Sequence, residues 1–350
     1  MNHKGTKPGN MNFALIPLSW LYGTGGAVRR QYYRFFRKPQ KLGRPTIKVG
    51  NIVAGGTGKT PFVIYLARLL KKRNLQPVVL TRGFGRASSG VLKIGDSSGS
   101  TSTVEESGDE PKLIADQARC PVYVCENRME GATIALRDFP HATFLLDDAY
   151  QQLGIRADIN FVLIDATNPF GNGRLLPAGT LREPIRQLSR ADAIVITHAD
   201  HPFDQDALME RLKKHNRAAP LFFAYHEVIG LQEVPGGEWH DARRFRGAKA
   251  VALSAIGNPS VFEHDLRHHQ IQVLEHLALR DHFPYSQEML DRALRRCQEV
   301  GADIIVTTEK DAVKMDSFQI PSGKIYALGI ETRVDEQENF IEYLKMFLDL

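Results

Sequence analysis

The sequence has few cysteines, no long uninterrupted apolar run and no strong excess of one charge. Its 350 residues contain three cysteines, Cys120, Cys125 and Cys297, and no C-x-x-C pair. This excludes a disulfide framework and a zinc site of that type, and it fits a reducing compartment. The formal net charge of +5 is too mild to predict a nucleic-acid partner, because basic residues cluster visibly only near the N-terminus.

What the sequence does contain is an alternation of short β-branched runs with helical patterns from Pro45 onward. This alternation predicts an α/β fold with a mostly parallel sheet covered by helices on both faces. We expect three segments: an N-terminal helical segment over 1–40, a main domain over 41–220 and a smaller α/β lobe over 221–350. The Ser-, Gly- and Thr-rich stretch 88–107 reads as a mobile connection.

One glycine-rich turn predicts a phosphate-binding loop. The run Lys48-Val49-Gly50-Asn51 leads from a predicted strand into this turn, and a helix is expected from Pro61. Backbone N–H groups of such a turn bind phosphate, the lysine adds charge at the β- and γ-phosphates, and the final hydroxyl can hold Mg²⁺. The residues of the turn are Ala54, Gly55, Gly56, Thr57, Gly58, Lys59 and Thr60. We therefore expect a nucleoside triphosphate with Mg²⁺ as the ligands.

Carboxylates follow two apolar strands and are candidate metal ligands. Asp147 and Asp148 come directly after one strand, and two adjacent acids there are costly unless they meet a cation. Asp165 ends the other strand and is a rival ligand, although it could equally cap the next loop.

The N-terminal segment combines apolar, aromatic and basic residues. Its apolar part, residues 11–22, is interrupted by Pro17 and followed by glycines, so it is too short to span a bilayer. A secretory signal is rejected because the phosphate loop begins barely thirty residues later. Arginines then alternate with Tyr32, Tyr33, Phe35 and Phe36. Such a segment can lie in a membrane interface, or it can be an ordinary helix packed on the domain, and the two are compatible.

A series of further motifs occurs in order and resembles one known family. They are Gly50–Pro61, Thr81–Arg86, Gly108–Pro111, Asn127-Arg128, Asp147-Asp148, Phe170–Gly179, Leu181–Pro184 and Thr307–Asp311. Together they closely resemble the tetraacyldisaccharide 4'-kinases of Gram-negative bacteria, over nearly the whole chain. The resemblance implies phosphoryl transfer from ATP to the 4'-hydroxyl of tetraacyldisaccharide 1-phosphate, which gives lipid IVA. It also implies peripheral attachment to the cytoplasmic face of the inner membrane, and we expect a monomer.

The resemblance assigns roles to individual residues. Asp109 matches the catalytic base and His282, in Asp281–Tyr285, matches the histidine that assists it. Arg128 matches a phosphate contact, and Glu183 a part of the Mg²⁺ environment, with Lys59 also in the catalytic set. Arginine suits phosphate through its paired donors, and a fixed carboxylate can accept the proton of a sugar hydroxyl.

The chain departs from the family after the paired aspartates. It has Ala149-Tyr150-Gln151-Gln152 where the family has G-F-Q-H. Alternatives of another class are a nucleotide-dependent switch ATPase, disfavoured because Ala54 replaces the second lysine of such loops, and a non-catalytic nucleotide binder at a membrane. The histidines His264, His268 and His269 have helical spacing but no third ligand spaced to join them, so a solvated face is favoured over a metal site.

Overall fold

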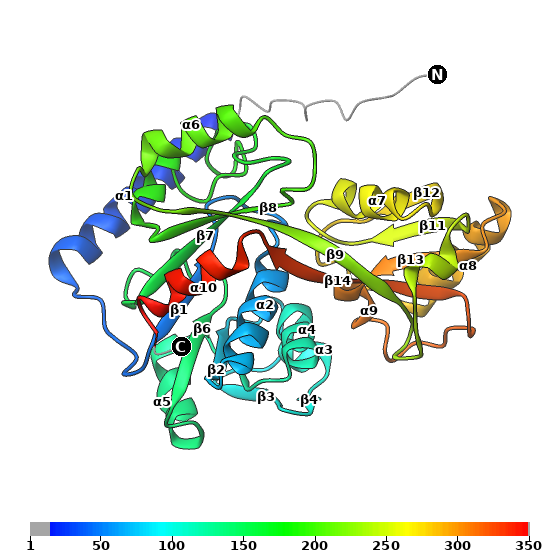
Figure 1. Ribbon diagram of the computed structural model, residues 1–350, viewed down its shortest axis with the longest axis horizontal. Helices are drawn as coiled ribbons and strands as arrows, with labels where there is room; N and C mark the ends of the chain where they lie inside the picture. The colour runs from blue at the N-terminus through cyan, green and yellow to red at the C-terminus, as the bar shows by residue number, and fades with distance from the viewer. Residues whose placement is uncertain (1–14, 349–350) are drawn as a thin grey trace.

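The computed structural model describes residues 15–348, which form two lobes joined along one long sheet (Figure 1). The strand order is β12-β11-β13-β14-β9-β8-β7-β1-β6-β2-β5-β3-β4, and β10 (Trp239–His240) pairs with β9 outside this path. Most neighbours are parallel; the antiparallel pairs are β9 with β14, β9 with β10, β3 with β5 and β3 with β4. The prediction of a mostly parallel α/β sheet is confirmed.

The first lobe is built around a central strand that ends at the glycine-rich turn. Its parallel strands are β1 (Thr46–Gly50), β2 (Gln76–Thr81), β5 (Val122–Val124), β6 (Ala142–Leu146), β7 (Ile159–Asp165) and β8 (Ala193–Thr197). Every residue of β1, β6 and β8 is buried, which explains the apolar runs of β6 and β8, while β1 also buries Lys48.

Helices cover both faces of this sheet, as the sequence predicts. On one face lie α2 (Lys59–Lys72) and α4 (Asp109–Ala118), which share an apolar core with the strands. On the other face lie α5 (Arg128–Asp138), α6 (Gln205–His215) and the 3-10 helix η2 (Ile185–Arg190). The helix expected from Pro61 is α2, which begins two residues earlier.

The second lobe repeats the same architecture on a smaller scale. Its strands are β11 (Lys249–Ser254), β12 (Gln272–Ala278) and β13 (Ile304–Thr308). Helix α7 (Pro259–His268) packs on one face and α8 (Gln287–Glu299) on the other, while the short helix α9 (Glu309–Ala312) follows β13 and η3 (Ala242–Phe245) precedes β11.

Two long antiparallel strands join the lobes. β9 (Leu221–Glu233) leaves the first lobe beside β8, and β14 (Ile325–Val334) returns along it (Figure 1). Helix α10 (Gln337–Lys345) then places Phe340 in the first lobe's core, where its ring meets those of Phe62 and Phe161. The domain boundary at residue 220 stays a prediction. Residues 334–348, which the sequence assigned to the C-terminal lobe, contact the core of the first lobe.

Residues 88–107 are not the plain connection that their composition indicates. They contain β3 (Leu92–Asp96), β4 (Gly99–Ser100) and α3 (Val104–Ser107). Thr103 caps α3, since its side chain accepts from the Glu106 backbone while the Glu106 carboxylate accepts from the Thr103 N–H. This is a capping box, whose T-x-x-E signature was present in the sequence.

The N-terminal segment forms α1 (Ile16–Phe36), which lies against the first lobe. Ser19 Oγ anchors it by donating to the Leu175 carbonyl at 2.8 Å. Large side chains nevertheless face solvent: Trp20 is 73% exposed and Phe36 77%. None of the helices within residues 15–348 is long and apolar enough to cross a membrane. Residues 1–14, which carry the first part of the expected apolar stretch, lie outside the described range.

Candidate functional site

The predicted phosphate loop has the strand–turn–helix geometry that its function requires. It joins β1 to the first turn of α2, and Gly55 and Gly58 adopt φ values of 122° and 71° that favour glycine. Asn51 Nδ2 donates to Thr57 Oγ1 at 2.7 Å, and the Ala54 N–H donates to the Thr180 carbonyl at 2.6 Å. The turn is thus held from both sides at the N-terminus of a helix, where phosphate binds.

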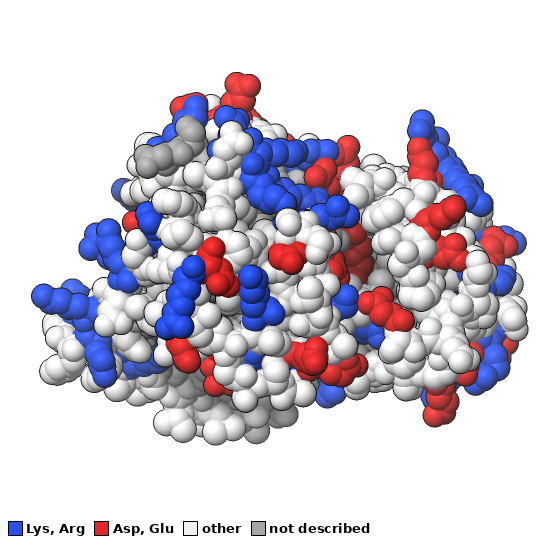
Figure 2. Space-filling view, turned by 90° about the horizontal axis from the view of Figure 1, so that it is seen from below, with Lys and Arg blue, Asp and Glu red and all other residues white. Residues whose placement is uncertain are grey.

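The loop opens into a cleft between the two lobes. The first lobe contributes Gly55–Thr60 and one face of α2, and the second lobe contributes parts of α7, α9 and β14. The lobes touch at the loop itself: a Cβ built on Gly257 would lie 2.2 Å from the backbone nitrogen of Gly56. The second lobe therefore closes directly over the phosphate loop. In Figure 2, acidic side chains lie in a recess between the lobes.

Asp147 lies at the end of β6, which pairs with β1, and its carboxylate is buried beside the loop. Oδ2 accepts a hydrogen bond from Thr81 Oγ1 at 3.0 Å, but the buried Oδ1 has no partner among residues 15–348. Burial, followed by the charges of Glu110 and Asp148, raises the pKa of Asp147 to about 6. A buried carboxylate oxygen without a donor is suited to a cation.

Asp148 turns the other way from its neighbour, with a φ of 45°. Both of its oxygens accept from Arg182 Nη1 at 2.8 Å, and Lys59 Nζ lies 3.9 Å from Oδ1. Burial opposes the ionisation of Asp148, but these two cations outweigh it and hold its pKa below the ordinary value. Thr60, in the first turn of α2, is also buried. Thr60 and the two aspartates thus come from the loop and from the adjacent strand.

Glu183 is buried and already bound by cationic side chains. Arg190 Nη2 donates to its two oxygens at 2.8 and 2.9 Å, and Arg30 Nη1 of α1 lies 3.6 Å from Oε2. Gln151 Nε2 donates both to Glu183 Oε1 at 3.0 Å and to the Asn51 carbonyl at 2.9 Å. Glu183 is therefore tied to the phosphate loop through Gln151 and to the N-terminal helix through Arg30.

Arg128 opens α5 and is only 2% exposed. Nη1 donates to the Cys125 carbonyl, Nη2 donates to the Asp147 carbonyl at 3.4 Å, and Nε has no partner among the described residues. Burial lowers the pKa of Arg128. The Arg128 side chain thus contacts the backbone of Asp147, and its Nε–H remains available to donate to a ligand.

The predicted Asp109–His282 pair forms across the cleft. Asp109 begins α4 in the first lobe, and its Oδ2 lies 3.0 Å from Nδ1 of His282, which follows β12 in the second lobe. Lys314 Nζ lies 3.5 Å from the same oxygen. Burial disfavours the charged form of Asp109, but the hydrogen bond with His282 and the charges of Lys310 and Lys314 outweigh it and hold the pKa below the ordinary value. The carboxylate is ionised at neutral pH.

The same contact acts on the imidazole. The hydrogen bond to Asp109 raises the pKa of His282, although burial and the charge of Lys310 oppose the shift. His282 is held with a φ of 58°, and its ring lies 5.3 Å from that of Phe84. The ring is thus oriented by groups from both lobes.

Sequence reasoning missed several charged partners of these residues. Lys310 Nζ lies 3.0 Å from Glu110 Oε1 and 3.3 Å from Asp281 Oδ1. These contacts link α9 to the residues next to Asp109 and His282. Arg182 and Lys310 stand within motifs that the sequence displayed, but their partners are distant in the chain. Only the fold identifies those partners.

Asp165, the rival metal ligand, is occupied by protein groups. Its Oδ1 accepts from the Thr167 N–H at 2.9 Å, as a cap of the next loop, and Oδ2 accepts from Asn258 Nδ2 at 2.9 Å. His198 Nδ1 lies 3.0 Å from Oδ1. The capping alternative is therefore the one that the structure supports.

Comparisons with known proteins point to one family. The family model described as tetraacyldisaccharide-1-P 4'-kinase matches residues 11–349. The tetraacyldisaccharide 4'-kinase of Halothermothrix orenii is 35% identical over 340 residues, 91% of this chain and 88% of that protein. The one of Syntrophus aciditrophicus is 35% identical over 349 residues, 96% and 93% of the two chains.

A solved structure extends the likeness to three dimensions. The crystal structure of the "apo" form of LpxK from Aquifex aeolicus in complex with ATP matches with a TM-score of 0.75 and 30% identity. The match covers 96% of this chain and 99% of that one. With the phosphate loop, the paired aspartates and the Asp109–His282 contact in place, we conclude that the chain belongs to the tetraacyldisaccharide-1-phosphate 4'-kinase family.

Proposed function

We propose that the protein transfers the γ-phosphoryl group of ATP to the 4'-hydroxyl of tetraacyldisaccharide 1-phosphate, which yields lipid IVA in lipid A biosynthesis. The observation that carries the proposal is the 3.0 Å contact of Asp109 with His282 at a cleft that also holds the phosphate loop. A carboxylate at this place can receive the proton of a hydroxyl that attacks a bound phosphoryl group.

ATP is the nucleotide in this proposal, with its phosphates on Ala54–Thr60 and its remaining part in the cleft lined by α2 and β14. Lys59 lies at the start of α2 and faces Asp148 at 3.9 Å, a separation that leaves the ammonium group free to turn toward phosphate. The buried Arg128, with its unpaired Nε, supplies positive charge behind Asp147. The positive charges of Arg128 and Lys59 support transfer of the phosphoryl group by stabilising its negative charge.

Mg²⁺ is the metal in this proposal, and the chemistry of the donor set fits it. Thr60 Oγ1 and the unpartnered Asp147 Oδ1 are hard oxygen donors, and Asp148 lies beside them. Mg²⁺ would neutralise phosphate charge there. Glu183 belongs to this environment through Gln151, which links it to the phosphate loop at Asn51.

Proton transfer is the task of Asp109 in the proposed reaction. Its low pKa keeps the carboxylate ionised, and Lys310 and Lys314 stabilise that form. His282 orients the carboxylate through Nδ1, and the same contact raises the pKa of His282. Because His282 belongs to the second lobe, the pair forms only when the lobes are apposed.

The lipid substrate requires a membrane surface, and α1 supplies a suitable face. Its exposed apolar side chains include Trp20, Leu21, Phe35 and Phe36, and Lys and Arg side chains project from the end of the lobe at which α1 ends (Figure 2). A second cavity lies between α1 and the loops that carry Gln151, Arg182 and Glu183. We propose peripheral attachment through α1 to the cytoplasmic face of the inner membrane, with the protein acting as a monomer.

One assay tests the proposal. The protein is incubated with labelled ATP, Mg²⁺ and tetraacyldisaccharide 1-phosphate in detergent, and a doubly phosphorylated lipid is expected. Lys59→Ala should lose this product, whereas Lys214→Ala, an exposed lysine on α6, should keep it. Lipid-independent hydrolysis without lipid product would favour the switch ATPase, and nucleotide binding without turnover would favour the non-catalytic binder.

A further inference from the structure

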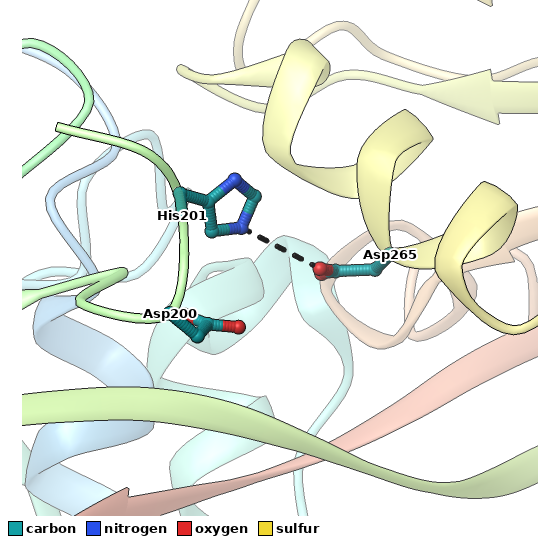
Figure 3. A group of neighbouring side chains, drawn as sticks. All are labelled: Asp200, His201 and Asp265. Carbon is teal, nitrogen blue, oxygen red and sulfur yellow. Dashed lines mark ion pairs between the residues drawn. The ribbon is translucent and has the colours of Figure 1, made fainter.

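A group of ligating side chains that the proposed reaction does not use lies between the lobes. Asp200 and His201 follow β8 in the first lobe, and Asp265 lies on α7 in the second lobe (Figure 3). One ligand atom of each lies within 4.8 Å of the other two. Three ligand atoms around a cation with bonds of about 2.0–2.2 Å lie roughly 3.3–3.8 Å from one another, so shifts of up to about 1 Å bring all three into its coordination sphere.

These side chains have coordination capacity to spare. His201 and Asp265 are each only 8% exposed, yet His201 Nε2 and Asp265 Oδ1 are 3.6 Å apart, too far for a good hydrogen bond. Neither carboxylate accepts a hydrogen bond from another side chain or backbone N–H within residues 15–348. Asp265 is buried in that state, which favours a cation as its partner, whereas Asp200 is exposed.

The electrostatic surroundings also favour positive charge. The carboxylates of Asp200 and Asp265 place negative charge beside His201. The ring of His264, also on α7, lies 4.2 Å from that of His201. One imidazole and two carboxylates, with a second imidazole beside them, form a mixed nitrogen and oxygen set.

We infer that Asp200, His201 and Asp265 form a binding site for a divalent transition-metal ion, with Zn²⁺ as the best fit. Mg²⁺ and Ca²⁺ prefer oxygen ligands alone, whereas imidazole with carboxylate suits Zn²⁺ and related ions. The site shares no residue with Thr60, Asp147 and Asp148.

The placement gives the site a structural consequence. Its ligands come from both lobes, so the complete set exists only while α7 faces the loop after β8. A ligand that binds only one arrangement stabilises it by a free energy that grows with the logarithm of the ligand concentration over its Kd. Zn²⁺ would therefore favour the closed cleft over the phosphate loop.

The test uses the full chain, stripped with a chelator and free of ATP, Mg²⁺ and lipid. Zn²⁺ is titrated in competition with a chromophoric chelator, and thermal melting is followed with and without Zn²⁺. One tight Zn²⁺ site per chain is expected. His201→Ala and Asp265→Asn should each weaken it by at least about tenfold, the scale on which single contacts at metal sites act. Zn²⁺ should raise the melting temperature of the wild type by a few degrees and that of His201→Ala by less.

The control is His268→Ala, which removes an exposed histidine from the same helix and should bind Zn²⁺ like the wild type. Melting in the chelator alone checks that each variant folds, and Asp200→Asn replaces any variant that does not. Equal Zn²⁺ affinity of the wild type and His201→Ala, or an equal loss in His268→Ala, would overturn the inference. Because no nucleotide or lipid is present, this result is independent of the proposed kinase activity.

Discussion

Gly257 offers the sharpest test of the idea that the second lobe completes the nucleotide site. A Cβ at this position would lie 2.2 Å from the Gly56 nitrogen and 3.0 Å from the Gly55 carbonyl carbon. Both neighbours are backbone atoms of the phosphate loop, so they cannot move aside as a flexible side chain would. Gly257→Ala must therefore either push the lobes apart or displace the loop.

The size of the effect follows from the overlap. Forcing one methyl group into close-packed surroundings costs about 1–3 kcal/mol. If that cost falls on the closed, nucleotide-binding arrangement, it corresponds to a rise in the Kd for ATP of about 5- to 150-fold. Titration calorimetry with ATP and Mg²⁺ measures the change, and the melting temperature of the ligand-free protein checks that the variant is folded.

The matched control is Gly25→Ala in α1, where an added Cβ meets no atom within 4 Å. Alanine also suits a helix interior better than glycine, by about 1 kcal/mol. This variant should bind ATP as the wild type does. A Gly257→Ala protein whose Kd for ATP stays within twofold of the wild type would refute the reasoning, because the lobe contact at Gly56 would then be irrelevant to binding.

Three further predictions concern the site and the membrane face. Asp109→Ala should bind ATP normally and lose lipid phosphorylation by about 10²-fold or more, while Asp116→Ala on the same helix retains it; near-normal transfer by the first variant would exclude Asp109 as the base. The pKa of Asp147 is about 6 in the folded protein, above the ordinary 3.8. Below pH 3.8 this carboxyl group has no effect on the stability of the fold, and as pH rises through about 6 its ionisation destabilises the folded state. In Mg²⁺-free buffer at pH 8, Asp147→Asn should therefore have a higher melting temperature than the wild type. The difference should shrink toward pH 4, and also when Mg²⁺ is added to the wild type. A difference that does not depend on pH would contradict the assignment. Trp20→Ala with Phe36→Ala should reduce co-sedimentation with anionic lipid vesicles without changing ATP affinity, and unchanged sedimentation would favour a purely structural role for α1.

The phosphate loop illustrates what local sequence can predict. Its function depends on neighbours in the chain: a strand before it, glycines that reach positive φ, and a helix after it. All of these are short-range features, and the structure has them at the predicted positions. The same reasoning placed Asp147 at a strand end beside the loop, since parallel strands end at the same edge of a sheet.

Features that depend on contacts between distant parts of the chain could not be predicted in this way. The strand β9 passes from one lobe to the other and has mixed exposure along its length, so no simple apolar alternation marks it. Helix α10 follows β14 in the second lobe's part of the chain, yet Phe340 packs in the first lobe's core. Chain order gives no information on such a return, because the apolar face of a short helix fits either core equally well.

The sequence by itself determined the fold class, the phosphate loop, the paired aspartates and, through its ordered motifs, the family. These depend on local backbone requirements and on apolar periodicity, which neighbouring residues encode. Only the tertiary structure decided other charge pairs: Lys310 with Glu110, Glu183 with Arg190, and His201 with Asp265. These pairs lie across lobes or loops, and their free energies depend on burial and distance, which exist only once the chain has folded.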